Sequence, residues 1–107
     1  MLLKKIIKGY YNELFEEDKS KNYDDSNIRG VLSTKASGLL EVLDEKDMNG
    51  ENIDKKIISF LNFISGYDTP RFEDDGYLYD KNDLEREYAQ LGNLDSLEGA
   101  DIECKYI

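Results

Sequence analysis

The feature that most constrains the fold is the helical spacing of apolar residues in four separate stretches of the chain. Between residues 2 and 17, pairs of large apolar side chains recur every four residues, which places them on one stripe of an α-helix. Similar stripes run through residues 26–43, 53–65 and 80–91. Because such stripes are stable only when buried against one another, the sequence predicts a mainly α, small four-helix domain. The stretch 53–65 is the most hydrophobic and is predicted to be the central core helix.

Polar connectors separate these stretches. Residues 18–25 and 44–52 are rich in charged and amide side chains, and Asn49-Gly50 is a typical turn sequence. The C-terminal residues 101–107 alternate apolar and charged side chains, as a β-strand does. This segment could pair with Tyr77–Tyr79, which would add a short β-hairpin near the C-terminus.

The length of the chain predicts one domain, residues 1–107, since two domains would each be too small for an adequate core. Gly30 and Gly38 fall inside the second helical stretch. Glycine lowers helix stability by roughly 1 kcal/mol relative to alanine. The two glycines therefore either allow another helix to approach closely or divide this segment in two.

The charge balance restricts the classes of partner. The chain carries a formal net charge of −10, which argues against direct nucleic-acid binding and against docking on anionic membranes. The single cysteine, Cys104, cannot form an internal disulfide, and this favours a reducing, cytoplasmic location. No apolar run approaches the roughly 18 residues needed to span a bilayer.

Catalytic signatures are absent from the sequence. Without histidine, the chain can build neither a Ser-His-Asp triad nor a histidine-bearing zinc site, and it contains no phosphate-binding glycine motif. Adjacent carboxylates such as Asp74 and Asp75 could transfer protons, but among 24 carboxylates such pairs arise by chance. We therefore expect no enzymatic activity, no catalytic residue and no cofactor.

The connector after the second stretch partly resembles an EF-hand calcium loop. With Gly50 at the invariant glycine position, Glu45, Asp47 and Asn49 occupy three positions that normally supply oxygen ligands. Lys56 stands where a bidentate glutamate should complete the site. The sequence therefore favours a plain helix–turn–helix connector, and no metal site is predicted.

The strongest functional signal is the stretch Asp68–Glu87, which holds eight carboxylates and three bases around two tyrosines. Tyrosine provides contact area at low entropic cost, so tyrosine among acids indicates a surface for a basic protein. On an extended segment the two tyrosines would point to opposite faces, one inward and one outward. The alternative is a solvated acidic loop that leads into a capped helix. The predicted partner-binding residues of this stretch are Glu73, Asp74, Asp75, Tyr77, Tyr79, Asp80, Asp83 and Glu87.

A second candidate surface lies on the first predicted helix. Neighbouring residues on a helix point about 100° apart, so Tyr10 and Tyr11 cannot be equally buried, and one of them is expected to be half-exposed. If the exposed tyrosine has a role in binding, it would be an aromatic anchor flanked by acidic side chains. The helix also places its lysines before its acids, which opposes the macrodipole and is explained either by packing or by a partner. The candidate residues are Tyr11, Glu13, Glu16 and Glu17.

Together these features predict an acidic protein that binds and occludes a basic, nucleic-acid-processing enzyme. The combination of acid and tyrosine is similar to the surface chemistry of nuclease-immunity proteins, which neutralise nuclease toxins. A phage anti-defence DNA mimic, such as an anti-CRISPR or anti-restriction protein, is the alternative. Immunity is favoured because segments 1–12, 26–40 and 55–67 are net positive, whereas a duplex mimic needs a continuous acidic surface. A further alternative is a small helical accessory protein whose acidity serves only solubility.

Overall fold

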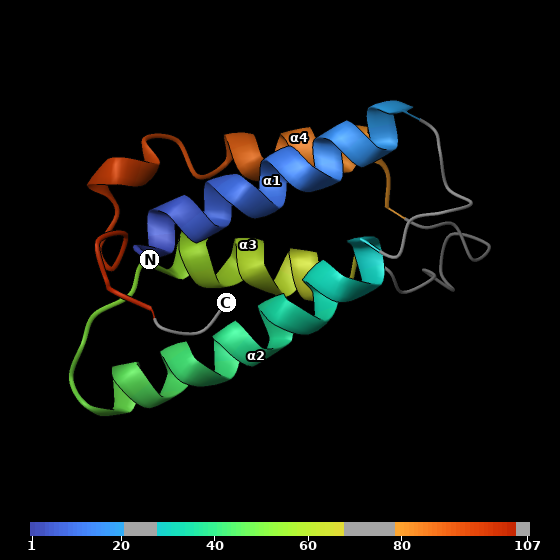
Figure 1. The fold of residues 1–107 in the computed structure, drawn as a ribbon. Coiled ribbons are helices and arrows are strands. Elements are labelled where there is room, and N and C mark those ends of the chain that lie inside the picture. Colours follow the sequence, from blue (N-terminus) through green and yellow to red (C-terminus); the bar gives the residue numbers. More distant parts are fainter. Residues whose placement is uncertain (21–27, 68–78, 105–107) are drawn as a thin grey trace.

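The computed structural model describes residues 1–20, 28–67 and 79–104, and it confirms the mainly α, four-helix architecture (Figure 1). Within these ranges there is no β-strand. None of the described helices has both the length and the apolar character needed to cross a membrane. The elements are α1 (Leu3–Ser20), α2 (Ile28–Met48), α3 (Lys55–Ser65), α4 (Lys81–Ala89) and the short 3₁₀ helix η2 (Leu94–Ser96).

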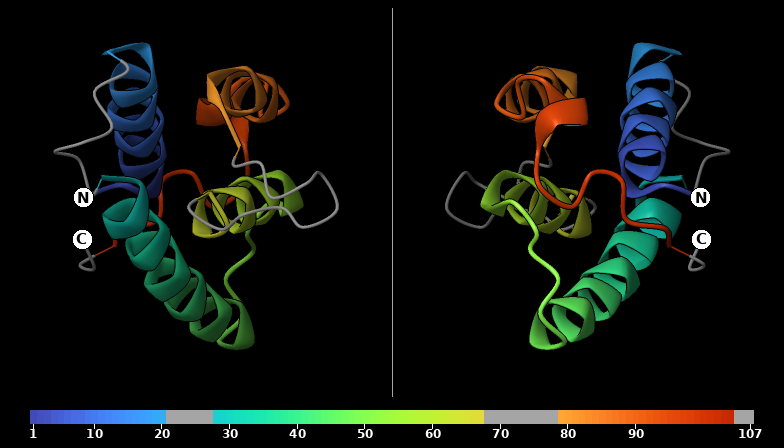
Figure 2. Two further views of the ribbon diagram at one scale, coloured as in Figure 1. Left: turned by 90° about the vertical axis from the view of Figure 1, so that its right-hand side faces the viewer. Right: turned by 90° about the vertical axis from the view of Figure 1, so that its left-hand side faces the viewer.

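The four α-helices enclose one hydrophobic core. Helix α2 packs most extensively against α3 and α1 against α4, while α1 also contacts α2 and α4 contacts α3. The two views of Figure 2 show α1 and α4 on one side of the molecule and α2 and α3 on the other. Helix α3 belongs to the core but is not its centre as predicted, because α1 and α2 bury as many apolar side chains and α3 packs mainly on α2. Four side chains of α3 are at most 1% exposed. These four are Ile57, Phe60, Leu61 and Ile64.

Helix α2 is longer than its apolar stripe predicts. It continues past Leu43 as far as Met48 and runs unbroken through both internal glycines, so much of the predicted connector 44–52 is helical. The added residues include Glu, Lys and Met, which are good helix formers, and no Gly or Pro interrupts them. The helix stops at the predicted turn, where Asn49 donates to the carbonyl of Glu45 and Gly50 has a φ of 92°.

The C-terminal segment pairs with the residues before α1. Leu2 and Glu103 form an isolated antiparallel bridge, and the amide of Leu3 donates to the carbonyl of Ile102 at 2.8 Å. The first amides of a helix lack partners inside it, and the C-terminal segment supplies the missing carbonyls. The predicted β-hairpin is therefore not found in the described part of the chain; residues 77, 78 and 105–107 of that prediction lie outside it.

The C-terminal segment also supports the connector between α2 and α3. The amide of Asp54 donates to the carbonyl of Glu98 at 2.8 Å. At Gly99, φ is 89°, and an added Cβ would lie 3.2 Å from both the carbonyl oxygen of Asn52 and the Cα of Ile53. Only glycine suits this combination of left-handed backbone and close approach. The contact holds Ile53 in the connector that precedes α3.

The reversed charge order of α1 has an intramolecular explanation. Lys4 forms an ion pair with Asp101 at 2.8 Å, and Lys8 approaches Asp95 at 3.3 Å. The hydrogen bond to Asp101 raises the pKa of the Lys4 ammonium above its usual value. The early lysines of α1 therefore hold the segment that follows α4, and no external partner is needed to account for them.

Candidate partner-binding surfaces

One buried arginine contacts Tyr67, which precedes the acidic stretch, and Tyr79, which lies within it. The guanidinium of Arg29, on α2, donates to the carbonyl of Tyr79 at 2.7 Å and lies 3.5 Å from that of Tyr67. It also stacks 4.5 Å from the centre of the Tyr67 ring. These contacts hold Tyr67 and Tyr79 against α2. Four predicted binding residues lie outside the described part of the chain and stay predictions: Glu73, Asp74, Asp75 and Tyr77.

Tyr79 faces the protein interior. Its ring lies 4.7 Å from that of Phe63 in an edge-to-face arrangement and 6.2 Å from that of Tyr67 in a stacked one. The side chain is half-buried and packs against the core. Of the two tyrosines expected to point in opposite directions, Tyr79 therefore packs inward, and it does not serve as an outward anchor in this arrangement.

Asp80 and Asp83 stabilise the start of α4. The carboxylate of Asp80 accepts hydrogen bonds from the amides of Asn82 and Asp83, at 3.0 and 3.1 Å. In return, the carboxylate of Asp83 accepts from the amide of Asp80 and forms an ion pair with Arg86 at 2.6 Å. This reciprocal pattern is a capping box. Both acids thus have a structural role, and Glu87, farther along α4, is half-buried.

Tyr11 belongs to the contact between α1 and α4. Its ring stacks on that of Tyr88 with the centroids 3.9 Å apart and lies 5.7 Å from that of Phe15. Burial, assisted by the nearby charge of Glu85, raises the pKa of the Tyr11 phenol above 10.0. Tyr10 is buried in the core while Tyr11 is half-buried, which matches the expected division between the two neighbours.

Glu13 and Glu16 point away from the aromatic contact. Along a helix they lie at about 200° and 140° from Tyr11, so the three do not form one surface. Both glutamates are exposed and line an open groove between α1 and α2 with Ile28 and Val31. Glu17 lies in α1, but its side chain is outside the described part of the structure.

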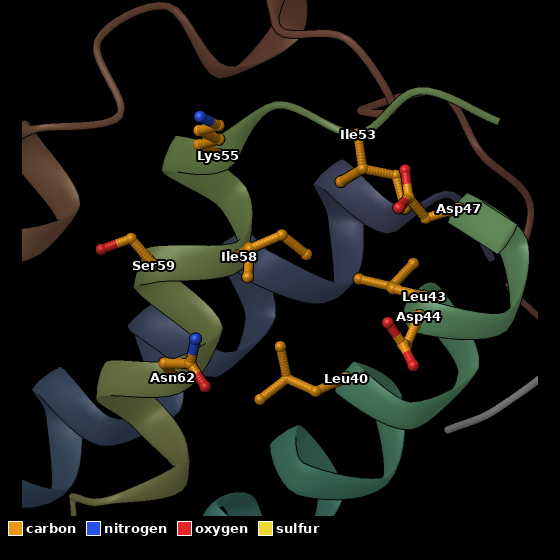
Figure 3. A pocket seen from close by; sticks show the side chains of 9 residues that line it. All are labelled: Leu40, Leu43, Asp44, Asp47, Ile53, Lys55, Ile58, Ser59 and Asn62. Atoms are coloured by element: carbon orange, nitrogen blue, oxygen red, sulfur yellow. The ribbon is translucent and has the colours of Figure 1, made fainter. Parts of the chain in front are cut away.

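A second groove, which the sequence analysis missed, lies between the second half of α2 and the first half of α3 (Figure 3). It has a volume of about 480 Å³. Four apolar side chains line it, with Leu43 fully buried and the other three half-buried. In Figure 3 these side chains converge between the two helices, with Asp44 and Asp47 on the α2 rim. The apolar residues are Leu40, Leu43, Ile53 and Ile58, and the α3 rim carries Lys55, Ser59 and Asn62.

The α2 side of this groove is strongly negative. The last part of the helix carries four exposed carboxylates, and none of them forms an ion pair with another described residue. The C-terminal end of a helix already bears a partial negative charge, so these acids oppose the macrodipole and cost stability locally. We call the two carboxylates that line the groove, Asp44 and Asp47, the α2 acidic rim. Glu41 and Glu45 lie on other sides of α2.

The sequence contains a signal for this arrangement. Residues 40, 43, 44 and 47 have the spacing of a single helix face, so the two aspartates continue the apolar stripe of α2. The signal is visible only once α2 is known to extend to Met48. The same extension places Glu45 and Asp47 on a helix, so the partial EF-hand resemblance corresponds to no EF-hand loop. In the described part of the chain, no cluster of acids or cysteine is arranged to hold a metal ion.

Comparison with known proteins gives no match. No protein-family model matches the chain, and neither a curated protein nor a solved structure is significantly similar to it. The chain is therefore assigned to no family.

Proposed function

We propose that this protein is an acidic inhibitor that binds and occludes a basic, nucleic-acid-processing enzyme, as an immunity protein neutralises a nuclease toxin. The observation that carries the proposal is the α2 acidic rim beside the apolar groove. Asp44 and Asp47 have no ion-pair partner among the described residues, and three of the four neighbouring apolar side chains are only half-buried. A basic protein would satisfy both features at once.

The two parts of this surface have different roles in the proposed complex. Negative potential speeds the encounter with a positively charged cleft and disfavours wrong partners. Most of the affinity in protein complexes comes from a few well-packed, desolvated contacts, which the apolar groove can provide. The net charge of −10 extends the attraction beyond the contact surface itself.

The proposed action requires no bond-making by this chain. Cys104, the most nucleophilic side chain type present, is fully buried. Burial raises the pKa of its thiol, which keeps the thiol protonated and unreactive at neutral pH. Inhibition would therefore come from steric and electrostatic occlusion alone.

The distribution of charge supports immunity over duplex mimicry. Exposed lysines at the start of α3, Lys55 and Lys56, interrupt the acids of α2 and of the C-terminal segment. Helix α1 likewise carries Lys4 and Lys8 against the segment after α4. A DNA mimic would be expected to present a longer, continuous row of negative charge. The acidic surface instead suits one local patch on a cognate enzyme.

The test is to capture the partner and assay it in isolation. The immobilised protein is incubated with extract of its source cells, and the bound protein is identified, purified and tested for nuclease activity. We expect a basic protein whose nuclease activity is abolished at one equivalent of inhibitor. Inhibition of several unrelated DNA-binding enzymes would instead support a DNA mimic. A neutral partner, or self-association alone, would support the accessory protein and contradict inhibition.

A further inference from the structure

We propose that the groove between α2 and α3 is the docking site for a basic amphipathic helix of the partner. This inference rests on the proposed function and specifies which part of the partner makes the central contact. It follows from the shape of the groove, its length and the distribution of charge around it.

The shape of the groove suits a third helix. Helices α2 and α3 run antiparallel and separate towards the connector between Met48 and Lys55 (Figures 1 and 2). At this open end three apolar side chains remain partly accessible to solvent: Leu40, Ile53 and Ile58. Leu43, which also lines the groove, is fully buried. A helix laid between two others can bury its apolar stripe in such a groove, a common mode of peptide recognition.

The length of the groove limits the contact to about two helical turns. On α2 the lining residues run from Leu40 to Asp47, and on α3 they run from Lys55 to Asn62. At about 1.5 Å per residue, each side is roughly 10 Å long. A partner helix would therefore contribute apolar side chains at positions i, i+3 or i+4, and i+7.

The charges around the groove indicate which side of the partner helix faces α2. Asp44 and Asp47 lie on the α2 rim, whereas the α3 rim carries one cation, Lys55, and two neutral polar side chains. The flank of the partner helix that faces α2 should therefore carry arginine or lysine. Arginine fits better, because its planar guanidinium can bind carboxylate bidentately while its stem covers apolar surface.

The alternative recognition mode of strand addition is disfavoured. It requires an exposed sheet edge, and the described part of this chain contains no strand that could provide one. The half-buried apolar floor also distinguishes this groove from an acidic surface that merely attracts cations. The occupant is therefore inferred to be a helix with both an apolar stripe and a basic flank.

The probe for this test is a capped helical peptide with leucines at the i, i+3, i+7 positions and arginines along one flank. Its binding to the full chain, labelled with nitrogen-15, is followed by backbone amide shifts. We expect the shifts to concentrate in residues 40–47 and 53–62. A charge-reversed peptide with glutamate in place of arginine should not bind, and a scrambled peptide should bind at least tenfold more weakly.

A pair of matched double variants makes the test specific. Asp44→Asn with Asp47→Asn should weaken peptide binding about tenfold, since both changes remove carboxylates three residues apart on the groove rim. The control, Glu41→Gln with Glu45→Gln, removes the same charge from exposed positions of α2 that do not line the groove. The control should leave peptide affinity within twofold of the unmodified protein. Equal losses in both variants would show general charge attraction and overturn the inference.

The outcome separates this inference from the proposed function. If the captured enzyme is a nuclease that the protein inhibits, but the Asp44/Asp47 variant inhibits it equally well, the groove assignment is wrong and the function stands. Loss through Asp74→Asn with Asp75→Asn instead would place the contact on the acidic stretch. If the peptide binds the groove as expected but the captured partner has no nuclease activity, the function is wrong and the docking site stands.

Discussion

Gly99 allows the close contact between the C-terminal segment and the α2–α3 connector. Its φ of 89° lies in the left-handed region, and its Cα faces the backbone of Asn52 and Ile53. A side chain at this position would be strained and would push the two segments apart. Since Ile53 lines the groove between α2 and α3, Gly99 also helps to shape the candidate binding surface.

Replacing this glycine by alanine should destabilise the protein. Gly99→Ala is expected to cost at least about 1 kcal/mol for the left-handed backbone alone, with a further cost for the close contacts. For a domain of this size, 1 kcal/mol lowers the thermal midpoint by about 4–8 °C, which circular dichroism can measure. The control is Gly9→Ala in α1, where an added Cβ meets nothing within 4 Å. That change should leave the midpoint unchanged or raise it, and equal effects of the two variants would contradict this account.

Tyr11 and Tyr79 show that proximity in sequence does not identify the residues that an aromatic ring contacts. The acids that adjoin them in the chain predict a binding surface for both. Their rings are instead held by residues distant in sequence, Tyr88 for the first and Phe63 for the second. The helical period correctly predicted that Tyr10 and Tyr11 differ in burial, but it could not identify the tertiary partner of either ring.

At the scale of elements, α4 depends on its first turn. Isolated helices of nine residues are marginal in water, so a helix this short relies on packing and on its cap. Leu84 is its only fully buried side chain. The capping box formed by Asp80 and Asp83 is therefore expected to contribute measurably to the stability of the domain.

Two substitutions at the cap separate its structural role from a role in binding. Asp80→Ala should destabilise the fold by about 1 kcal/mol, because the amides of Asn82 and Asp83 lose their acceptor. Asp80→Asn keeps an acceptor at the same position and should be nearly neutral. Chemical denaturation measures both. If alanine has no effect on stability while asparagine weakens partner binding, Asp80 is a contact residue rather than a cap.

The elements differ in how well the sequence predicts their ends. Asp80 and Gly66 lie at the helix boundaries that capping preferences indicate. The sequence predicts the end of α2 too early, because the side chains change from apolar to charged after Leu43 while the helix continues to Met48. A helix can continue through charged, exposed residues when these are good helix formers. Hydrophobic periodicity detects buried faces, and it weakens where α2 projects beyond the core.

At the scale of the whole molecule, the candidate binding surface arises from the way α2 and α3 separate. Neither helix alone forms the groove, and its lining residues lie in two ranges that are joined by a turn. The fold class followed from local periodicity, whereas the interhelical geometry depends on packing between distant segments. The sequence therefore predicts the helices without locating the groove between them.

If electrostatic attraction brings this protein to a basic enzyme, the two should associate more slowly when salt screens their charges. The most direct test is the rate constant of association, kon, with the captured enzyme, measured by stopped-flow fluorescence at about 50 mM and about 500 mM salt. We expect kon to fall at least about tenfold at the higher salt concentration, while the helical signal of the protein is unchanged. A kon that changes by less than about twofold over this range would show that electrostatic attraction does not drive the encounter.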